Sequence, residues 1–368
     1  MTTLTARELN RATLDRQLLL RRRDMPAQQA VRHLAGLQAQ APHAPYVGLW
    51  CRLSGFTPET LSTLITERTV VRAPIFRGTV HAVGAEDFLA FRPLFDGLMA
   101  GVLRTNFAKR LAGADMREIA RRGSDLLAGR GPLTRTQLGQ ALAASWPDAD
   151  PSALAYVVTY LLPVVQVPPR GIWGKSAQAT WASADSWLPG VPAPVRKAAE
   201  LLLRYLAAFG PATVADAQVW SGLTRLREVT EQLDLRTWRG PDGAELLDLP
   251  DLPMSELAVS ELALPDEDVP APPRFLPEFD NLLLSHADRS RVNPEGRPPP
   301  LWPGNGATRG TLLVDGLWEA LWEITKPAAL TVSPFRPLTA AEKSAIEAEG
   351  VRLLEFTSPG ASPAIRFA

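Results

Sequence analysis

Two stretches in the first 250 residues repeat the same order of apolar and polar positions. In each, a long amphipathic helix runs into Gly-Pro, and a threonine two residues after the proline opens a second, apolar helix. The glycine ends the first helix and the proline prevents its continuation. A capping box is predicted at each second helix, formed by Thr134 with Gln137 and by Thr213 with Asp216.

Each repeat continues with a third helical pattern and then with short strand-like segments. The third helices are expected over residues 151–162 and 223–233. Three helices followed by a small hairpin is the order of a winged helix-turn-helix. The strand-like segments are VVQVPP (164–169), TWASA (180–184) and LRTWRG (235–240).

The N-terminal segment follows the same order less regularly. Thr5 and Glu8 predict a capping box for a helix that ends near Leu20, and a second helix is expected over residues 25–40. A third helix begins at Thr57, with proline in its first position. A strand pair, the predicted wing, follows at VVRAPIF (70–76) and GTVHAV (78–83).

The last third of the chain has a different pattern. Residues 249–273 are rich in Pro and Asp and predict a loop, after which three β-rich segments and a capped final helix follow. Between the β-rich segments lies a long stretch dense in Gly and Pro, predicted to form a hairpin tip. The predicted fold class is α+β, with three tandem winged helix-turn-helix units at 1–110, 111–190 and 191–250 packed around a C-terminal β-barrel with hairpin and final helix at 251–368.

Composition narrows the classes of function. The chain has 368 residues, of which 46% are hydrophobic and 21% charged, as in ordinary globular proteins. It has one cysteine, and its four histidines lack metal-ligand spacing, so neither a disulfide framework nor a metal site is expected. The charged N-terminus is unlike a signal peptide, and no apolar run is long enough for a membrane span. We therefore expect a cytoplasmic protein without cofactor or membrane partner.

The net charge of zero conceals an asymmetry between the two parts of the chain. Residues 1–150 contain 20 Lys and Arg against 13 Asp and Glu, whereas residues 151–368 contain 19 against 26. Nine acidic residues and no basic one lie between Arg239 and Arg274. A polyanion would therefore bind the first part and avoid the acidic stretch.

No familiar hydrolase motif is present, so motifs of that kind leave the function open. One stretch of the sequence changes this interpretation. Residues 34–53, LAGLQAQAPHAPYVGLWCRL, resemble the signature of AlkZ-like DNA glycosylases, whose defining element is Gln, a variable residue, then Gln. Four further stretches are similar to that family in order and spacing: RGTVH (77–81), GIWG (171–174), FLPEFDNLLLSHADR (275–289) and TLLVDGLWEALW (311–322).

The resemblance implies a concave DNA-binding channel and a glycosylase that removes N7-alkylated purines from double-stranded DNA and unhooks interstrand crosslinks. Because only five residues are Lys and none lies near the glutamines in sequence, we expect a monofunctional enzyme that leaves abasic sites. We also expect nucleoid association, no cofactor and no obligatory protein partner. Gln38 and Gln40 would be catalytic, and because a sister branch has Asp at the second position, this chain falls in the Gln-x-Gln branch.

The chemistry of glutamine agrees with that implied substrate. An amide oxygen accepts hydrogen bonds but is no general base like a carboxylate. A purine alkylated at N7 is cationic and departs as a neutral base, so the enzyme needs chiefly to stabilise the sugar cation and orient a water. Residues two apart on a helix face different ways, so we expect the second helix to end near Gln40, ahead of Pro42, with Gln38 on its last turn.

Six further residues are candidates for DNA contact: His43, Tyr46, Arg77, His81, Asn305 and Arg309. Two other functions stay open at this point. The helix-turn-helix units favour a non-enzymatic winged-helix regulator, although the third helix of the first unit has a single Arg and two Glu, unlike a base-reading helix. A protein-interaction scaffold that uses the acidic stretch over 240–273 is the second alternative.

Overall fold

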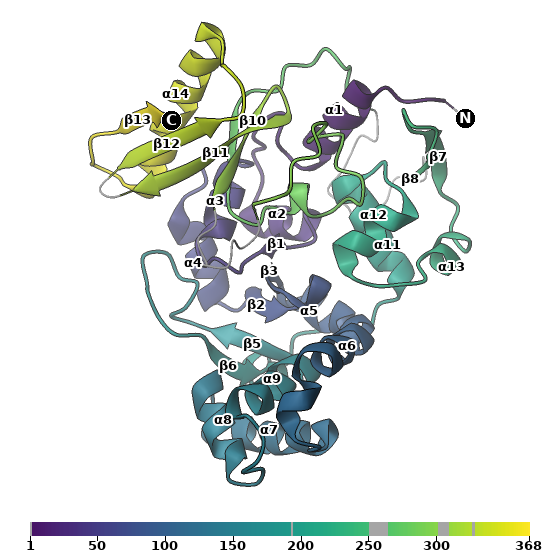
Figure 1. Ribbon diagram of the computed structural model, residues 1–368, viewed down its shortest axis with the longest axis vertical. Helices are drawn as coiled ribbons and strands as arrows, with labels where there is room; N and C mark the ends of the chain where they lie inside the picture. Colours follow the sequence, from purple (N-terminus) through teal and green to yellow (C-terminus); the bar gives the residue numbers. More distant parts are fainter. Residues whose placement is uncertain (1, 193, 250–263, 301–308, 326–327) are drawn as a thin grey trace.

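The computed structural model describes residues 2–192, 194–249, 264–300, 309–325 and 328–368 (Figure 1). The N-terminal helix α1 (Ala6–Arg16) has the predicted capping box of Thr5 and Glu8. The other elements of the first unit are α2 (Ala27–His33), β1 (Leu37–Gln38), α3 (Ala44–Trp50), α4 (Pro58–Thr66), β2 (Val70–Pro74), η1 (Phe76–Gly78) and β3 (Val80–Gly84).

The first two units share one sheet. Its six strands have the order β1-β3-β2-β5-β6-β4, in which β2 and β3 form the predicted antiparallel pair. β5 (Val164–Val167) and β6 (Thr180–Ser183) are the predicted strand pair of the second unit, and β4 (Leu133–Thr134) lies at the edge. Arg72 of β2 pairs with Gln166 of β5, so the two predicted wings are joined in one layer.

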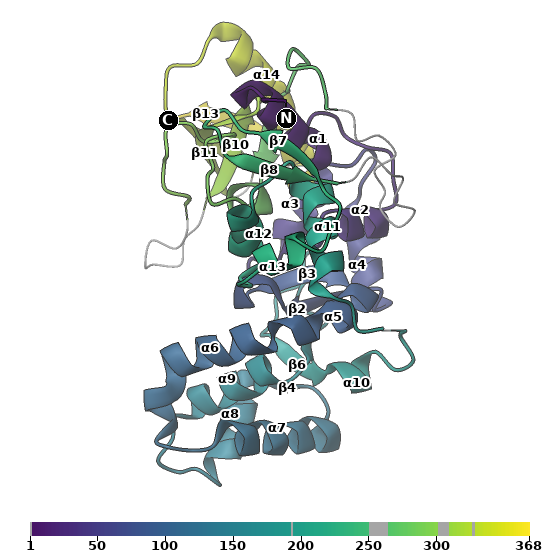
Figure 2. The ribbon, with the colours of Figure 1, turned by 90° about the vertical axis from the view of Figure 1, so that its right-hand side faces the viewer.

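Helices cover this sheet and form a separate lobe at the opposite end from the C-terminal sheet, as Figure 2 shows. Residues 85–111, for which the sequence pattern predicted no element, form α5 (Ala85–Phe91), η2 (Arg92–Phe95), α6 (Asp96–Phe107) and η3 (Ala108–Leu111). The predicted capping box of Thr134 and Gln137 is confirmed at the start of α8 (Arg135–Ala143), in the predicted second unit. The remaining helices are α7 (Met116–Arg130), α9 (Pro151–Leu161) and α10 (Ala184–Trp187).

The third unit repeats the predicted order on a smaller scale. α11 (Ala198–Phe209) ends at Gly210, and Thr213 with Asp216 forms the predicted capping box of α12 (Val214–Ser221). The expected third helix is reduced to α13 (Arg227–Thr230). β7 (Arg236–Arg239) and β8 (Glu245–Asp248) form a separate two-stranded sheet.

The C-terminal part is a five-stranded sheet with the order β13-β12-β11-β10-β9 and one long helix. Its outermost strands, β13 and β9, do not pair with each other among the described residues, so no closed barrel is found there. The predicted cap of Thr339 and Glu342 opens the final helix. The elements are β9 (Arg274–Leu276), η4 (Asn281–Leu283), β10 (Gly310–Val314), β11 (Leu317–Thr325), β12 (Ala329–Pro334), α14 (Ala340–Thr357) and β13 (Ala364–Phe367).

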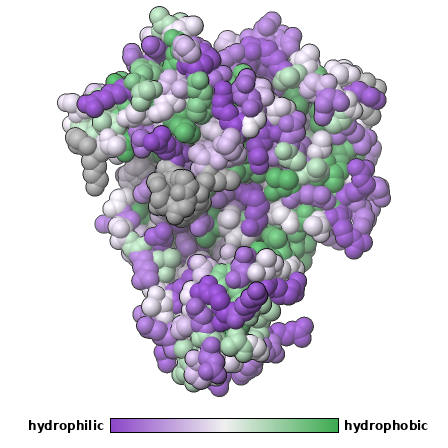
Figure 3. Space-filling model, in the orientation of Figure 1, coloured by the Kyte–Doolittle hydropathy of each residue, from purple (hydrophilic) through white to green (hydrophobic). Residues whose placement is uncertain are grey.

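The hydrophobic core crosses these regions. One cluster of buried side chains includes Leu37 of the first unit, Leu154 of the second and Leu312 of the C-terminal sheet. On the face shown in Figure 3, hydrophilic residues are interspersed with small hydrophobic patches. The first unit therefore shares one core with the second unit and with the C-terminal sheet.

Candidate active site

The glutamine motif lies on a strand that follows an early break in the second helix. α2 ends at His33, and the chain reverses through Ala35 and Gly36, whose φ angles are 53° and 93°. A Cβ on Gly36 would lie 3.1 Å from the carbonyl oxygen of Ala82, so glycine permits the close approach of β1 to β3. The prediction that Gln38 ends a helix is wrong, because this break comes before Pro42 can act.

A two-residue strand, instead of the predicted helix end, carries the first glutamine. Gln38 pairs with His81 of β3, and the ladder continues to Ala39, whose N–H donates to the carbonyl of Val80 at 2.8 Å. Residues two apart on an extended chain face the same side, with the residue between them facing the other. Ala39 is fully buried, whereas Gln40 is exposed. The chain bends at Gln40, just past the end of β1, so Gln38 lies buried in the ladder and Gln40 lies exposed beside it.

An arginine holds the side chain of Gln38. Nη2 of Arg77 donates to Oε1 of Gln38 at 2.8 Å and to Oδ1 of Asn281 at 3.2 Å, while its Nη1 donates to the carbonyl of Trp220 at 2.6 Å. Asn281 in turn donates from Nδ2 to the carbonyl of Gly36 at 3.2 Å. Gln38 itself is 7% exposed. Its amide oxygen therefore belongs to a network that joins four separate segments of the chain.

A second arginine holds the backbone between the glutamines. Nη2 of Arg72 donates to the carbonyl of Ala39 at 2.8 Å and to Oε1 of Gln166 at 3.2 Å. Gly171, with φ of 90°, packs against it so closely that a Cβ there would lie 2.3 Å from Cδ of Arg72. Gly171 of the GIWG stretch therefore packs against Arg72, and Arg72 in turn holds the carbonyl of Ala39, the residue before Gln40.

These two arginines are charged groups in a poorly solvated place. Burial lowers the pKa of Arg77 to about 10, and burial, aided by the charge of Arg170, lowers the pKa of Arg72 to about 10. Neither arginine forms an ion pair with a carboxylate within the described ranges. Both remain protonated at neutral pH, and their charge is met by amide and carbonyl oxygens.

His81 lies beside this network and is neutral. Burial, together with the charge of Arg77, lowers the pKa of His81 to about 3, although its bond to Thr79 opposes the shift. Nδ1 lies 3.0 Å from the carbonyl of Thr79, and because a carbonyl only accepts, the ring proton is on Nδ1. Since His81 is 0% exposed, it cannot serve as a solvent-accessible acid at neutral pH.

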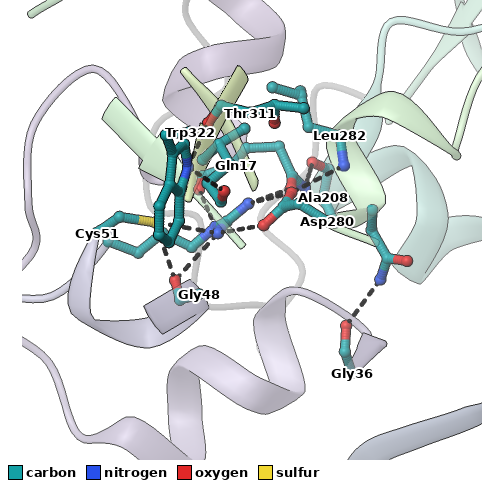
Figure 4. A network of polar contacts seen from close by, with 12 residues as sticks. Gln17, Gly36, Gly48, Cys51, Ala208, Asp280, Leu282, Thr311 and Trp322 are labelled. Carbon is teal, nitrogen blue, oxygen red and sulfur yellow. Dashed lines mark hydrogen bonds and ion pairs between the residues drawn. The ribbon is translucent and has the colours of Figure 1, made fainter. Parts of the chain in front are cut away.

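A small pocket beside Gln38 contains one carboxylate, and that group is already paired. Asp280 forms two hydrogen bonds of 2.9 Å with Arg52, which also donates to Gln17 and Gly48 (Figure 4). Burial disfavours the charge of Arg52, but Asp280 outweighs it and raises the arginine's pKa above its ordinary value. The pocket's lining thus offers amides and a neutralised ion pair, and no free carboxylate.

The volume of this pocket is about 10 Å³, which is room for roughly one water molecule. A purine base does not fit into it. This cavity is therefore not a place that receives a whole base.

A family model of DNA glycosylase AlkZ-like proteins matches residues 31–356. The chain belongs to the AlkZ-like DNA glycosylase family. Among solved structures, the DNA glycosylase AlkZ of Streptomyces sahachiroi is similar over 100% of both chains, with 19% sequence identity and a TM-score of 0.77. That likeness shows a common mixed α+β fold. No curated protein matches the sequence.

The AlkZ-like glycosylase is thus an enzyme of DNA repair, and its described residues show two further features. None of its described helices is both long and apolar enough to cross a membrane. Over the same ranges, His, Cys, Asp and Glu form no group of three that could hold a metal ion.

The other candidate residues of the glycosylase lie in different environments. His43 is exposed and precedes α3, on the surface that also exposes Gln40. Tyr46 is 1% exposed, and its hydroxyl donates to the carbonyl of Gly171 at 2.7 Å. As with His81, a direct DNA contact by Tyr46 would need a rearrangement. Arg309 is half-exposed and forms an ion pair with Glu323 at 3.3 Å, and Asn305 lies outside the described residues.

The sequence analysis did not identify four residues that shape the site of the glycosylase: Arg52, Arg72, Asp280 and Asn281. Arg72 gave one usable signal, because an arginine within an otherwise apolar strand is rarely buried without a specific role. Asp280 and Asn281 lie in the FDN part of a stretch that the family resemblance covers, but no pattern indicated their partners.

Proposed function

We propose that this glycosylase hydrolyses the N-glycosidic bond of cationic N7-alkylated purines in duplex DNA and leaves an abasic site, with Gln38 and Gln40 as its catalytic residues. The supporting observation is that the surface around Gln38 carries amides, while the one carboxylate of its pocket is bound to Arg52. A site without a free carboxylate suits a leaving group that needs no protonation.

The chemistry of the lesion explains why amides suffice. Alkylation at N7 places a positive charge on the purine, so cleavage of the C1′–N9 bond returns an electron pair to the ring and releases a neutral base. The sugar becomes cationic as the bond breaks, and a nearby amide oxygen stabilises that charge and orients the attacking water. An undamaged purine would leave as an anion and would be a poor substrate.

We further propose that the enzyme unhooks interstrand crosslinks joined through such bases. A crosslinked base is tethered to the opposite strand and cannot be swung fully into a deep pocket. The cavity beside Gln38, at about 10 Å³, is too small to receive a base, which agrees with a lesion that stays within the duplex.

The three helical units are proposed to act as winged helices that grip the duplex along a concave channel. The N-terminal part carries the excess of basic residues that a phosphate backbone attracts, 20 Lys and Arg against 13 Asp and Glu over residues 1–150. Arg309 and His43, both reachable by solvent, are the remaining accessible DNA contacts proposed among the described residues.

The test is base release from duplex DNA that contains one N7-methylguanine, under single-turnover conditions. We expect Gln38→Ala and Gln40→Ala to lower the rate by roughly 100- to 1000-fold while folding and DNA affinity are retained. Gln140→Ala, in an exposed position of α8, is the matched control and should react as the wild type does.

A second substrate, a duplex crosslinked through N7 of two guanines, tests the unhooking step. Release of methylguanine without unhooking would restrict the function to monoadducts. Tight DNA binding with no release of either base above the spontaneous rate would favour the non-enzymatic regulator instead.

A further inference from the structure

We propose that Arg77 is a positioning residue that divides the work between the two glutamines, so that Gln38 donates a hydrogen bond to the departing base and Gln40 accepts one from the attacking water. This inference rests on the proposed function and assigns an atom to each step. It begins from the orientation of the Gln38 amide, which the contacts of Arg77 determine.

The orientation of the Gln38 amide follows from the chemistry of its neighbour. A guanidinium has only donors, so the atom of Gln38 that lies 2.8 Å from Nη2 of Arg77 must be the carbonyl oxygen. The same reasoning applies to Asn281, whose oxygen faces Arg77 and whose NH₂ group meets the carbonyl of Gly36. Neither amide can turn over without placing a donor against a donor.

The position of Arg77 is restricted by its backbone, by a hydrogen bond and by close packing. Its backbone has φ of 54°, its Nη1 donates to the carbonyl of Trp220, and a Cβ on Gly222 would lie 3.2 Å from its Cα. The described ranges give it no carboxylate partner. Its charge is therefore directed at the oxygens of Gln38 and Asn281, and hydrogen bonds to a charged donor are stronger than those between neutral groups.

The NH₂ group of Gln38 is consequently the part of this side chain that can meet the substrate. Nε2 donates no hydrogen bond within the part of the chain that the structure describes, yet it is not among the enclosed side-chain atoms that lack a partner. It therefore keeps a surface that solvent can reach. The bond from Arg77 to the amide oxygen withdraws electron density and makes the N–H groups better donors.

A donor at this place assists the bond-breaking half of the reaction. The C1′–N9 electron pair moves into the purine ring, and the acceptor atoms of the purine become more electron-rich as the bond lengthens. A hydrogen bond from Nε2 to such an atom strengthens in the same process. Water then adds to C1′ and loses its proton to bulk solvent. The exposed amide oxygen of Gln40 accepts a hydrogen bond from that water and orients it.

Glutamate substitutions separate the two roles, because glutamate has nearly the shape of glutamine but only accepts when ionised. We expect Gln38→Glu to lower single-turnover base release by roughly 100-fold with unchanged DNA affinity and no loss of melting temperature, since the new carboxylate can pair with Arg77. Gln40→Glu should stay within about tenfold of the wild type, because its acceptor is retained. A Gln38→Glu variant that is as active as the wild type, or an inactive Gln40→Glu variant, would overturn the division of roles.

Substitutions of Arg77 test the positioning step. Arg77→Lys keeps a charged donor and should restore part of the base-release rate that Arg77→Met loses, at equal DNA affinity. A role in packing alone would be served as well by methionine, so equal rates for the two variants would contradict the proposal. Arg104→Met, at an exposed position of α6, is the matched control.

A measurement independent of activity distinguishes this proposal from the proposed function. Arg77→Met, Gln38→Leu and the double variant form a cycle in urea unfolding, and we expect the two substitutions to be non-additive. Additive effects would overturn the contact on which the positioning role depends. No base release by the wild-type protein would instead overturn the proposed function and the division of roles together, while non-additivity would keep Arg77 as the residue that fixes Gln38.

Discussion

Arginines on two sides of the glutamine strand meet opposite environments. Arg52 lies against Asp280 in a buried ion pair, and the carboxylate raises the pKa of the arginine despite burial. Arg77 and Arg72 have only neutral oxygens as described partners, and burial lowers the pKa of each to about 10. The charge of Arg52 is thus balanced by a carboxylate, whereas the charges of Arg77 and Arg72 face only neutral hydrogen-bond acceptors among the residues that the structure describes.

The difference agrees with the proposal that Arg77 positions Gln38. A buried ion pair that is fully bonded acts as a fixed link, here between the segment after α3 and the start of η4. A buried charge without a counter-ion is costly and is retained where its field acts on a neighbour. In this molecule those neighbours are the oxygen of Gln38 and the carbonyl of Ala39, which belong to the glutamine motif.

The largest effect is expected when the paired arginine loses its partner. Asp280→Ala would leave the guanidinium of Arg52 buried and uncompensated, and should lower the free energy of unfolding by about 3–5 kcal/mol. Urea unfolding measures this change. Asp125→Ala, which breaks an exposed pair with Arg121, is the control and should have no measurable effect. A loss for Asp280→Ala no greater than that of the control would end the distinction between the two environments.

A smaller loss of stability is expected at an arginine without a carboxylate. Arg72→Met removes a donor from the carbonyl of Ala39 but leaves no charge behind, so the free energy of unfolding should fall by roughly 1–3 kcal/mol. Base release should fall with it, because the peptide preceding Gln40 loses its hold. Urea unfolding and the single-turnover rate of base release are measured on the same preparation. If Arg72→Met lowers the free energy of unfolding more than Asp280→Ala does, the expected order of the two environments is wrong.

The smallest effect is expected in the pH dependence of stability that His81 causes, because burial and the charge of Arg77 lower its pKa. The folded pKa of His81, about 3, lies below the unfolded value of 6.5. The unfolded chain therefore takes up a proton first, so stability is complete above pH 6.5 and falls as the pH drops toward 3. Near pH 5 one such group contributes a slope of about 1.4 kcal/mol per pH unit.

His81→Phe should remove the histidine's contribution to the slope of the free energy of unfolding between pH 6.5 and 5, a range that lies above most carboxylate titrations. Urea unfolding at several pH values gives the two slopes. If the wild type and His81→Phe show the same slope, the histidine is not held neutral by its surroundings.

The four predicted capping boxes were interpreted correctly, because their partners lie within one helical turn. The capping boxes at Thr5, Thr134, Thr213 and Thr339 are all present. Each depends on residues three apart, whose geometry the backbone sets by itself. The strand pair β2 and β3 was likewise predictable, because a short connection joins two apolar segments.

The end of α2 shows where a local rule was outweighed. Pro42 predicted a helix through Gln40, but Ala35 and Gly36 end it earlier, and β1 then pairs with β3. That pairing needs a backbone more than 40 residues away in sequence, as the partners Gln38 and His81 show. A strand of two residues has too short a pattern to be predicted without its partner.

The sequence by itself determined the starts of the four capped helices and, through family resemblance, the glutamine motif. Only the tertiary structure decided what surrounds that motif. Arg77, Asn281 and Trp220 come from three distant segments and meet at Gln38, and Arg52 meets Asp280 from 228 positions away. Contacts within a helical turn follow from backbone geometry, whereas contacts across the chain depend on how all the packed layers close together, and no local pattern contains that information.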